Sequence, residues 1–309
     1  MLRLAVLASL AAVLLAGCGL GAGEERAGVG ADLRVTRDFG HEQLLARSGL
    51  KIREDETVMR LLKRNADVET RFGGGFVQEI GGVAGGGATG TSDWFYFVNG
   101  IEADEGAADY ELSPGDVIQW DHRDWGQTMD TRAIVGAFPQ PFLDGLDGKR
   151  FPVRVECEDV ESAPCVDVKQ RLRDAGVAAN GASLGASGNQ RVARVVVARW
   201  ERARQLPTAR LVELGPRRSG VFARFVDEGA ALELLAEDGG VARTERAGAG
   251  LVAALRPTDD ELVWLVTGVD DAGVESAAAA FRARDLRNAF AVAASPDRVP
   301  QKLPLRRER

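Results

Sequence analysis

A serine motif is the first run of residues whose spacing could carry chemistry. Residues 181–185 read Gly-Ala-Ser-Leu-Gly, a pattern that serine hydrolases place between a strand and a helix. In this chain we expect a helix before Ser183 and a strand after it. A hydrolase of that class also needs a histidine downstream, and His41 and His122 both precede the serine. We therefore expect no hydrolase site here.

A glycine-rich run at residues 85–90 matches the G-x-G-x-x-G pattern. Dinucleotide-binding folds place these glycines at the start of a helix that holds pyrophosphate, whereas here they precede a strand and predict a flexible hairpin. Glycines allow close approach of a ligand to the backbone, and aromatic rings give large, rigid contact area. The predicted ligand-binding residues are Gly85, Gly87, Gly90, Trp94 and Tyr96. The alternative is that both aromatic residues belong to the core.

Acidic residues do not form a recognisable catalytic or metal-binding set. Three candidate ligands in residues 121–124, Asp-His-Arg-Asp, rarely converge on one ion when they are consecutive. The acidic pairs at 259–260 and 270–271 lack the spacing of a calcium loop and are typical of a turn and a helix start. We expect that the protein binds no metal, requires no cofactor and is not an enzyme. The less favoured alternative is an enzymatic activity in the carboxy-terminal half.

Two of the three cysteines are close in the sequence. Cys157 and Cys165 lie eight residues apart across an acidic segment that ends in Pro164, which suits a loop or a wide hairpin. A metal pair or a redox motif would need other spacing and more ligands. The pattern predicts a structural disulfide worth about 2–3 kcal/mol on the chain-entropy model.

The remaining cysteine stands after an apolar amino terminus. Residues 1–17 combine Arg3 with the apolar run 4–16, as a secretory signal does. The sequence Leu-Ala-Gly-Cys at residues 15–18 resembles the lipobox of bacterial lipoproteins. This resemblance implies a signal peptide cut before Cys18, acylation of that cysteine, and a location on the extracytoplasmic face of the cell membrane. Residues 18–30 would form a tether; the alternative is a secreted protein whose Cys18 is incidental.

Composition suggests a two-domain protein. The chain has 309 residues, 45% hydrophobic and 28% charged, with a formal net charge of −7, which argues against a nucleic-acid partner. No later segment has about 18 consecutive apolar residues, so no transmembrane helix is expected.

The first domain is predicted at residues 31–125. Leu33 and Val35 indicate a strand, residues 57–66 an amphipathic helix, and residues 94–98 a strand that is apolar on both faces. Residues 94–100, 108–112 and 114–120, Trp-Phe-Tyr-Phe-Val-Asn-Gly, Ala-Asp-Tyr-Glu-Leu and Pro-Gly-Asp-Val-Ile-Gln-Trp, resemble the transcobalamin-like C-terminal domain. That family implies a β-grasp fold and a corrinoid ligand, although no large helical barrel precedes the domain here.

The second domain is predicted at residues 150–295. Residues 126–149, rich in proline and glycine, would be a linker. Apolar runs at 195–197 and 262–266 alternate with helical patterns and predict a layered α/β, Rossmann-like domain. Residues 296–309 would form a loose basic tail.

Two function hypotheses follow. The first is a lipid-anchored binding protein that captures a corrinoid or other small ligand for an importer. The second is a scaffolding lipoprotein of the cell envelope whose β-grasp domain docks another protein.

Overall fold

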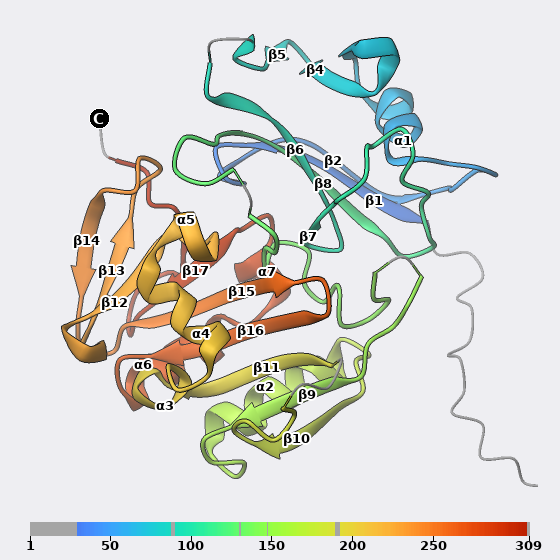
Figure 1. Ribbon diagram of the computed structural model, residues 1–309. Coiled ribbons are helices and arrows are strands. Elements are labelled where there is room, and N and C mark those ends of the chain that lie inside the picture. The colour runs from blue at the N-terminus through green and yellow to red at the C-terminus, as the bar shows by residue number, and fades with distance from the viewer. Residues whose placement is uncertain (1–29, 88–89, 130, 147, 189–191, 308–309) are drawn as a thin grey trace, which may run out of the picture.

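The computed structural model describes residues 30–87, 90–129, 131–146, 148–188 and 192–307. The predicted signal peptide, Cys18 and the tether up to residue 29 lie outside the described residues. The protein is a mixed α/β fold built on a five-stranded and a seven-stranded sheet (Figure 1). No helix in the described ranges is long and apolar enough to cross a membrane.

The amino-terminal sheet has its first and last strands paired in parallel at its centre. Its order is β2-β1-β8-β6-β7, and every other pairing is antiparallel. The strands are β1 (Ala31–Arg37), β2 (Glu42–Leu50), β6 (Ser92–Val98), β7 (Ile101–Glu102) and β8 (Val117–Asp124). The sequence placed a second strand around Leu50 and Ile52; the structure ends β2 at Leu50.

One helix, α1 (Val58–Asn65), packs on this sheet. The Thr57 side chain caps it by accepting a hydrogen bond from the Arg60 backbone N–H. Val58, Leu61 and Leu62 form its buried face, as the i, i+3, i+4 spacing predicts. The predicted helix at 57–66 is thus confirmed to within a residue at each end.

A small sheet, which we did not predict from the sequence, follows α1 and precedes the glycine-rich run at residues 85–90. It contains β3 (Val68–Arg71), β4 (Phe76–Ile80) and β5 (Val83–Ala84), with the 3-10 turn η1 (Phe72–Gly74) between the first two. The Trp94 indole donates a hydrogen bond to the Val83 carbonyl, 3.0 Å away. The small sheet is therefore tied to β6.

The carboxy-terminal sheet has the order β10-β9-β11-β16-β15-β17-β18. The first four strands are parallel, and the last three are antiparallel to their neighbours. Their bounds are β9 (Val153–Cys157), β10 (Ala179–Ser183), β11 (Ala193–Arg199), β15 (Gly250–Thr258), β16 (Glu261–Gly268), β17 (Ala291–Ala294) and β18 (Gln301–Leu303).

Both faces of this sheet are covered. Val195 and Val197 belong to the core under α2 (Ala163–Asp174) and α6 (Asp271–Ala280), whereas Val196 lies in the core on the opposite face. The opposite face carries α3 (Trp200–Ala203), α4 (Pro207–Arg210), η3 (Leu211–Leu214), α5 (Pro216–Ser219) and the sheet of β12 (Ala223–Val226), β13 (Ala231–Leu235) and β14 (Val241–Glu245). The 3-10 turn η4 (Asp227–Gly229) follows β12, and the short helix α7 (Ala283–Leu286) precedes β17.

Three sequence expectations need correction. Strand β10, which we did not predict, ends at Ser183 of the serine motif where we expected a helix directly before that serine, and residues 184–188 form a turn. Residues 126–149 are not a free linker, since Ile134, Val135 and Phe142 are buried in the cores. The tail is not loose where it supplies β18, which pairs with β17.

Cys157 and Cys165 form a disulfide. Cys157 is the last residue of β9, and Cys165 lies in the first turn of α2. The bond spans a strand-to-helix loop rather than a hairpin and fixes the start of α2 to the sheet.

The turn between β1 and β2 joins the two sheets. Asp38, Phe39 and Gly40 all have positive φ, at 55°, 57° and 76°. The Phe39 ring packs against Phe222 and Phe290 of the carboxy-terminal half, with centroid distances of 4.9 and 5.2 Å. A Cβ on Gly40 would lie 1.7 Å from the Asn288 carbonyl oxygen, so only glycine fits there.

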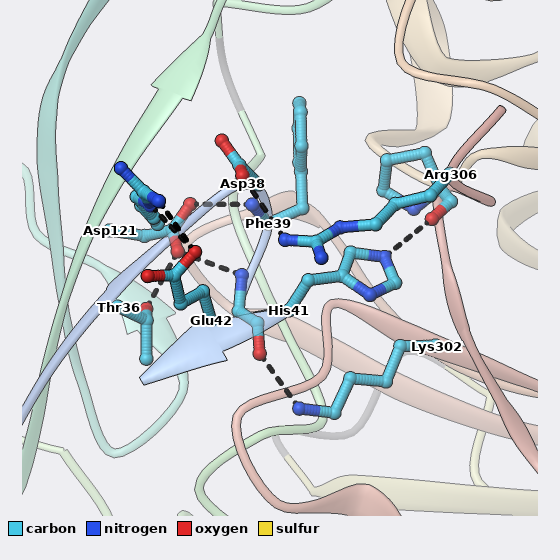
Figure 2. Close-up of polar contacts among 11 residues, drawn as sticks. Thr36, Asp38, Phe39, His41, Glu42, Asp121, Lys302 and Arg306 are labelled. Atoms are coloured by element: carbon cyan, nitrogen blue, oxygen red, sulfur yellow. Dashed lines mark hydrogen bonds and ion pairs between the residues drawn. The ribbon is translucent and has the colours of Figure 1, made fainter. Parts of the chain in front are cut away.

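Polar contacts surround this turn (Figure 2). The Asp121 carboxylate accepts hydrogen bonds from the Thr36 hydroxyl and from the backbone N–H groups of Phe39 and Gly40, at 2.6, 3.0 and 2.8 Å. Lys302 of β18 donates to the Gly40 carbonyl at 2.7 Å. The carboxylate therefore holds the turn in its left-handed conformation.

Candidate functional site

The candidate site is an open groove beside β6, named here the aromatic groove. It has a volume of about 520 Å³, within the range of small-molecule sites. It is lined by Phe76, Trp94, Phe95, Tyr96, Glu102, Ala103, Asp104, Met129 and Arg132. These residues come from β4, from β6, from β7 and the residues after it, and from the segment after β8.

Two large apolar side chains at the groove are unusually exposed. Phe76 is 41% exposed and Met129 is 57% exposed, beside the partly buried rings of Phe95 and Tyr96. Phe72, which is 87% exposed, lies next to Phe76 with a ring-centroid distance of 6.3 Å. Exposed apolar groups gathered around a concavity are typical of a binding surface.

Trp94 lines the groove but is itself 5% exposed. Besides its hydrogen bond to Val83, its ring lies 5.2 Å from the His122 ring. Trp94 therefore also belongs to the core, and it is placed to report a bound ligand more than to contact a large part of it.

Tyr96 forms another part of the wall. Its ring lies 5.0 Å from Trp120 at an interplanar angle of 31°, and its hydroxyl donates to the Glu105 carbonyl at 2.6 Å. Burial, together with the nearby charges of Glu105 and Asp109, raises the pKa of Tyr96 above its usual value. Tyr96 is therefore a fixed, neutral surface.

The predicted glycines do not line the groove. The Gly85 N–H donates to the Gln78 carbonyl, and the Gly90 N–H donates to the Gly86 carbonyl. A Cβ on Gly90 would lie 2.5 Å from the Gly86 Cα. The close approach of Gly86 therefore explains this glycine. The part of the predicted set that the structure brings together at the groove is Trp94 and Tyr96.

Charged side chains lie in and beside the groove lining. Arg123 is buried, pairs with Glu102 at 3.0 Å and lies 3.9 Å from the centre of the Phe95 ring. Arg132 pairs with Asp259 at 2.5 Å. A ligand in the groove would thus meet apolar rings together with the charged side chains of Glu102, Asp104 and Arg132.

The residues at 121–124 do not converge on one point. Asp121 faces the β1–β2 turn, whereas the neighbouring His122 ring packs on Trp94, as alternation along a strand requires. Burial lowers the pKa of His122. Within the described ranges, no group of three or more acidic, histidine or cysteine residues is placed to hold a metal ion.

Sequence reasoning missed Phe76, Met129 and Arg132. Phe72 and Phe76 flank the three glycines at residues 73–75, and their exposure could have been suspected from that setting. Nothing in the local sequence of Met129 or Arg132 indicates that the chain returns to β6.

Comparison with known families supports a domain in this region. Residues 55–123 match the family described as Domain of unknown function (DUF4430), which lies inside the predicted first domain. The match includes seven of the nine lining residues and leaves out Met129 and Arg132. No curated protein matches the chain significantly.

Proposed function

We propose that this protein is a non-enzymatic, lipid-anchored binding protein on the extracytoplasmic face of the cell membrane, and that the aromatic groove captures a small ligand with a planar or apolar part. The observation that carries the proposal is the exposure of Phe76 and Met129 at a groove walled by Phe95 and Tyr96. Burying such side chains under a ligand contributes about 25 cal/mol per Å² of apolar area.

The strand order supports the finer assignment of the first domain. A mixed sheet whose first and last strands run parallel at its centre, with one helix packed on it, resembles the β-grasp arrangement and supports that proposal. With the transcobalamin-like resemblance, it makes a corrinoid the first ligand to test. The open groove covers one side of such a ligand, so we expect modest affinity. We further propose that the second domain is Rossmann-like, since its four parallel strands have cores on both faces.

The binding prediction is tested by tryptophan fluorescence during titration of the full chain with a corrinoid, haem and cell-wall fragments. We expect at least one of them to quench the Trp94 emission saturably. The double variant Phe76→Ala/Met129→Ala should weaken binding at least tenfold, about 1.4 kcal/mol, because both side chains contact the ligand. Its melting temperature should stay close to that of the wild type, since both side chains are exposed.

The matched control is Leu44→Ala/Val299→Ala, which removes two exposed apolar side chains, 39% and 83% exposed, outside the groove lining. It should bind as the wild type does. A flat, unsaturable response of the wild type to all three ligand classes would contradict small-molecule capture.

A second candidate function is docking of another envelope protein at the same surface. The exposed pair Phe72 and Phe76 favours it, because contiguous exposed aromatic residues mark interfaces as well as ligand sites. Under this function, Phe72→Ala would weaken partner binding as strongly as Phe76→Ala.

The anchoring proposal rests on the lipobox resemblance at Cys18. When the gene is expressed in a bacterium supplied with a labelled fatty acid, we expect the wild type to carry the label. Cys18→Ser should abolish labelling and leave an uncleaved or mislocalised precursor, because acylation precedes cleavage in bacterial lipoproteins. A wild type without label would show that the protein is not a lipoprotein.

A further inference from the structure

A second pocket, named here the arginine pocket, is rich in positive charge. Its lining includes Arg132, Arg217, Arg218 and Arg256, no acidic residue among the described ones lines it, and its volume is about 260 Å³. The chain has a formal net charge of −7. Four arginines around one small pocket are therefore a local concentration of positive charge on a protein that is negative as a whole. Such a local positive field attracts anions.

Two of these arginines are held in place. The Arg256 side chain is 8% exposed and lies 3.4 Å from Asp259 and 3.6 Å from Asp104. Arg132 donates to the Pro257 carbonyl at 3.3 Å and pairs with the same two aspartates, at 2.5 and 4.0 Å. These pairs fix the base of the pocket and neutralise part of its charge.

The other two arginines have no acidic partner among the described residues. Arg217 and Arg218 are exposed on α5. The Arg217 Nε and Nη2 atoms are each 3.4 Å from the neutral Gln127 side-chain oxygen. The Arg218 side chain makes no hydrogen bond or ion pair with the part of the chain that the structure describes, although its backbone N–H donates to the Gly215 carbonyl. Their guanidinium groups are therefore available, and guanidinium binds phosphate or carboxylate through paired hydrogen bonds.

The arginine pocket adjoins the aromatic groove, because Arg132 lines both. The backbone N–H of Glu102, another groove residue, donates to the Arg132 carbonyl at 3.2 Å. The aromatic groove and the arginine pocket thus meet at the Arg132 side chain.

We propose that the arginine pocket binds the anionic group, a phosphate or a carboxylate, of a ligand whose apolar part lies in the aromatic groove. The proposal rests on the proposed function of the groove and adds the chemical class of the ligand. It predicts an amphipathic anion rather than a neutral planar molecule.

The test compares 1-naphthyl phosphate, 1-naphthol and inorganic phosphate by isothermal titration calorimetry on the full chain. The affinity for naphthol measures binding in the groove alone. The affinity for naphthyl phosphate measures binding in the groove together with the arginine pocket. We expect the phosphate ester to bind at least tenfold more tightly than naphthol. Raising the salt concentration should weaken the binding of the phosphate ester but not that of naphthol, since salt screens the charged contact.

Charge-matched variants locate the effect. Arg217→Gln/Arg218→Gln should reduce the affinity for naphthyl phosphate about tenfold or more and leave that for naphthol unchanged. The control Arg53→Gln/Arg202→Gln removes two exposed arginines outside the pocket lining and should leave both affinities unchanged.

The outcomes separate the two proposals. Equal affinities for naphthol and its phosphate would overturn the anion proposal and leave the groove standing, whereas binding of neither would overturn both. Vesicles of phosphatidylglycerol and of phosphatidylcholine identify the source of the anion. If only phosphatidylglycerol vesicles retain the protein, and the variant Arg217→Gln/Arg218→Gln is not retained, the proposal is supported with a lipid headgroup as the ligand. Binding of the soluble ester without vesicle retention would support it with a free phosphate.

Discussion

Replacing Phe39 with alanine should lower the free energy of unfolding by about 3–5 kcal/mol. Phe39 is fully buried at the tip of the β1–β2 turn. It belongs to the core on the face of the seven-stranded sheet that is opposite to α2 and α6. Its removal leaves a cavity between Phe222 and Phe290 and deletes an apolar connection between the two sheets. Urea denaturation followed by circular dichroism measures the change.

The control for this prediction is Leu44→Ala on β2, near the same turn. Leu44 is 39% exposed, so its truncation should change stability by less than about 0.5 kcal/mol. If Phe39→Ala were as mild as Leu44→Ala, the turn would not connect the two halves of the protein energetically.

Local patterns in the sequence predicted the elements that depend on local physics. The helix α1 follows from the cap at Thr57 and from the spacing of Val58, Leu61 and Leu62. Strands β11 and β16 follow from apolar runs that are buried on both faces. The disulfide between Cys157 and Cys165 follows from spacing and composition.

Elements that depend on distant partners were missed. Strand β10 is partly exposed and contains Gly181, so it has neither the alternation nor the propensity of a strand, and its pairing with β9 alone defines it. Strand β18 lies in a segment rich in proline and arginine and pairs with β17. In both cases tertiary contacts override weak local preference.

The candidate site shows the same division. Trp94 and Tyr96 were predicted because aromatic residues next to a glycine-rich run are visible locally. Phe76, Met129 and Arg132 reach the aromatic groove from separate segments, and their meeting depends on how the chain folds after β8. Likewise, nothing local indicates that Phe39, in the short turn between β1 and β2, is buried against Phe222.

Asp121 should make the stability of this protein depend on pH between about 4 and 7. Burial raises its pKa to about 7, against the hydrogen bonds from Thr36 and Gly40 and the charge of Arg123, which lower it. The ordinary value, 3.8, applies to the unfolded chain. Between these two values the folded state binds more protons than the unfolded state, so the free energy of unfolding falls as pH rises. A shift of about three units corresponds to about 4 kcal/mol.

The variant Asp121→Asn removes this titration. The amide keeps one acceptor oxygen but turns an N–H₂ group toward the donors of Thr36, Phe39 or Gly40, so the variant should be less stable at every pH. The informative quantity is the difference in unfolding free energy between wild type and variant, measured in urea at pH 4.5, 6 and 8. The other titrating groups contribute to both proteins. The advantage of the wild type should be largest at pH 4.5 and smallest at pH 8.

The exposed residue Asp67 supplies the control, since Asp67→Asn makes the same chemical change at a position that is not buried. A wild-type advantage that stayed constant from pH 4.5 to 8 would mean that Asp121 titrates alike in the folded and unfolded states. An advantage that grew with pH would mean that the hydrogen bonds from Thr36, Phe39 and Gly40, with the nearby charge of Lys302, outweigh the cost of burial. The carboxylate would then stabilise the β1–β2 turn as an anion, and its pKa would lie below 3.8 rather than near 7.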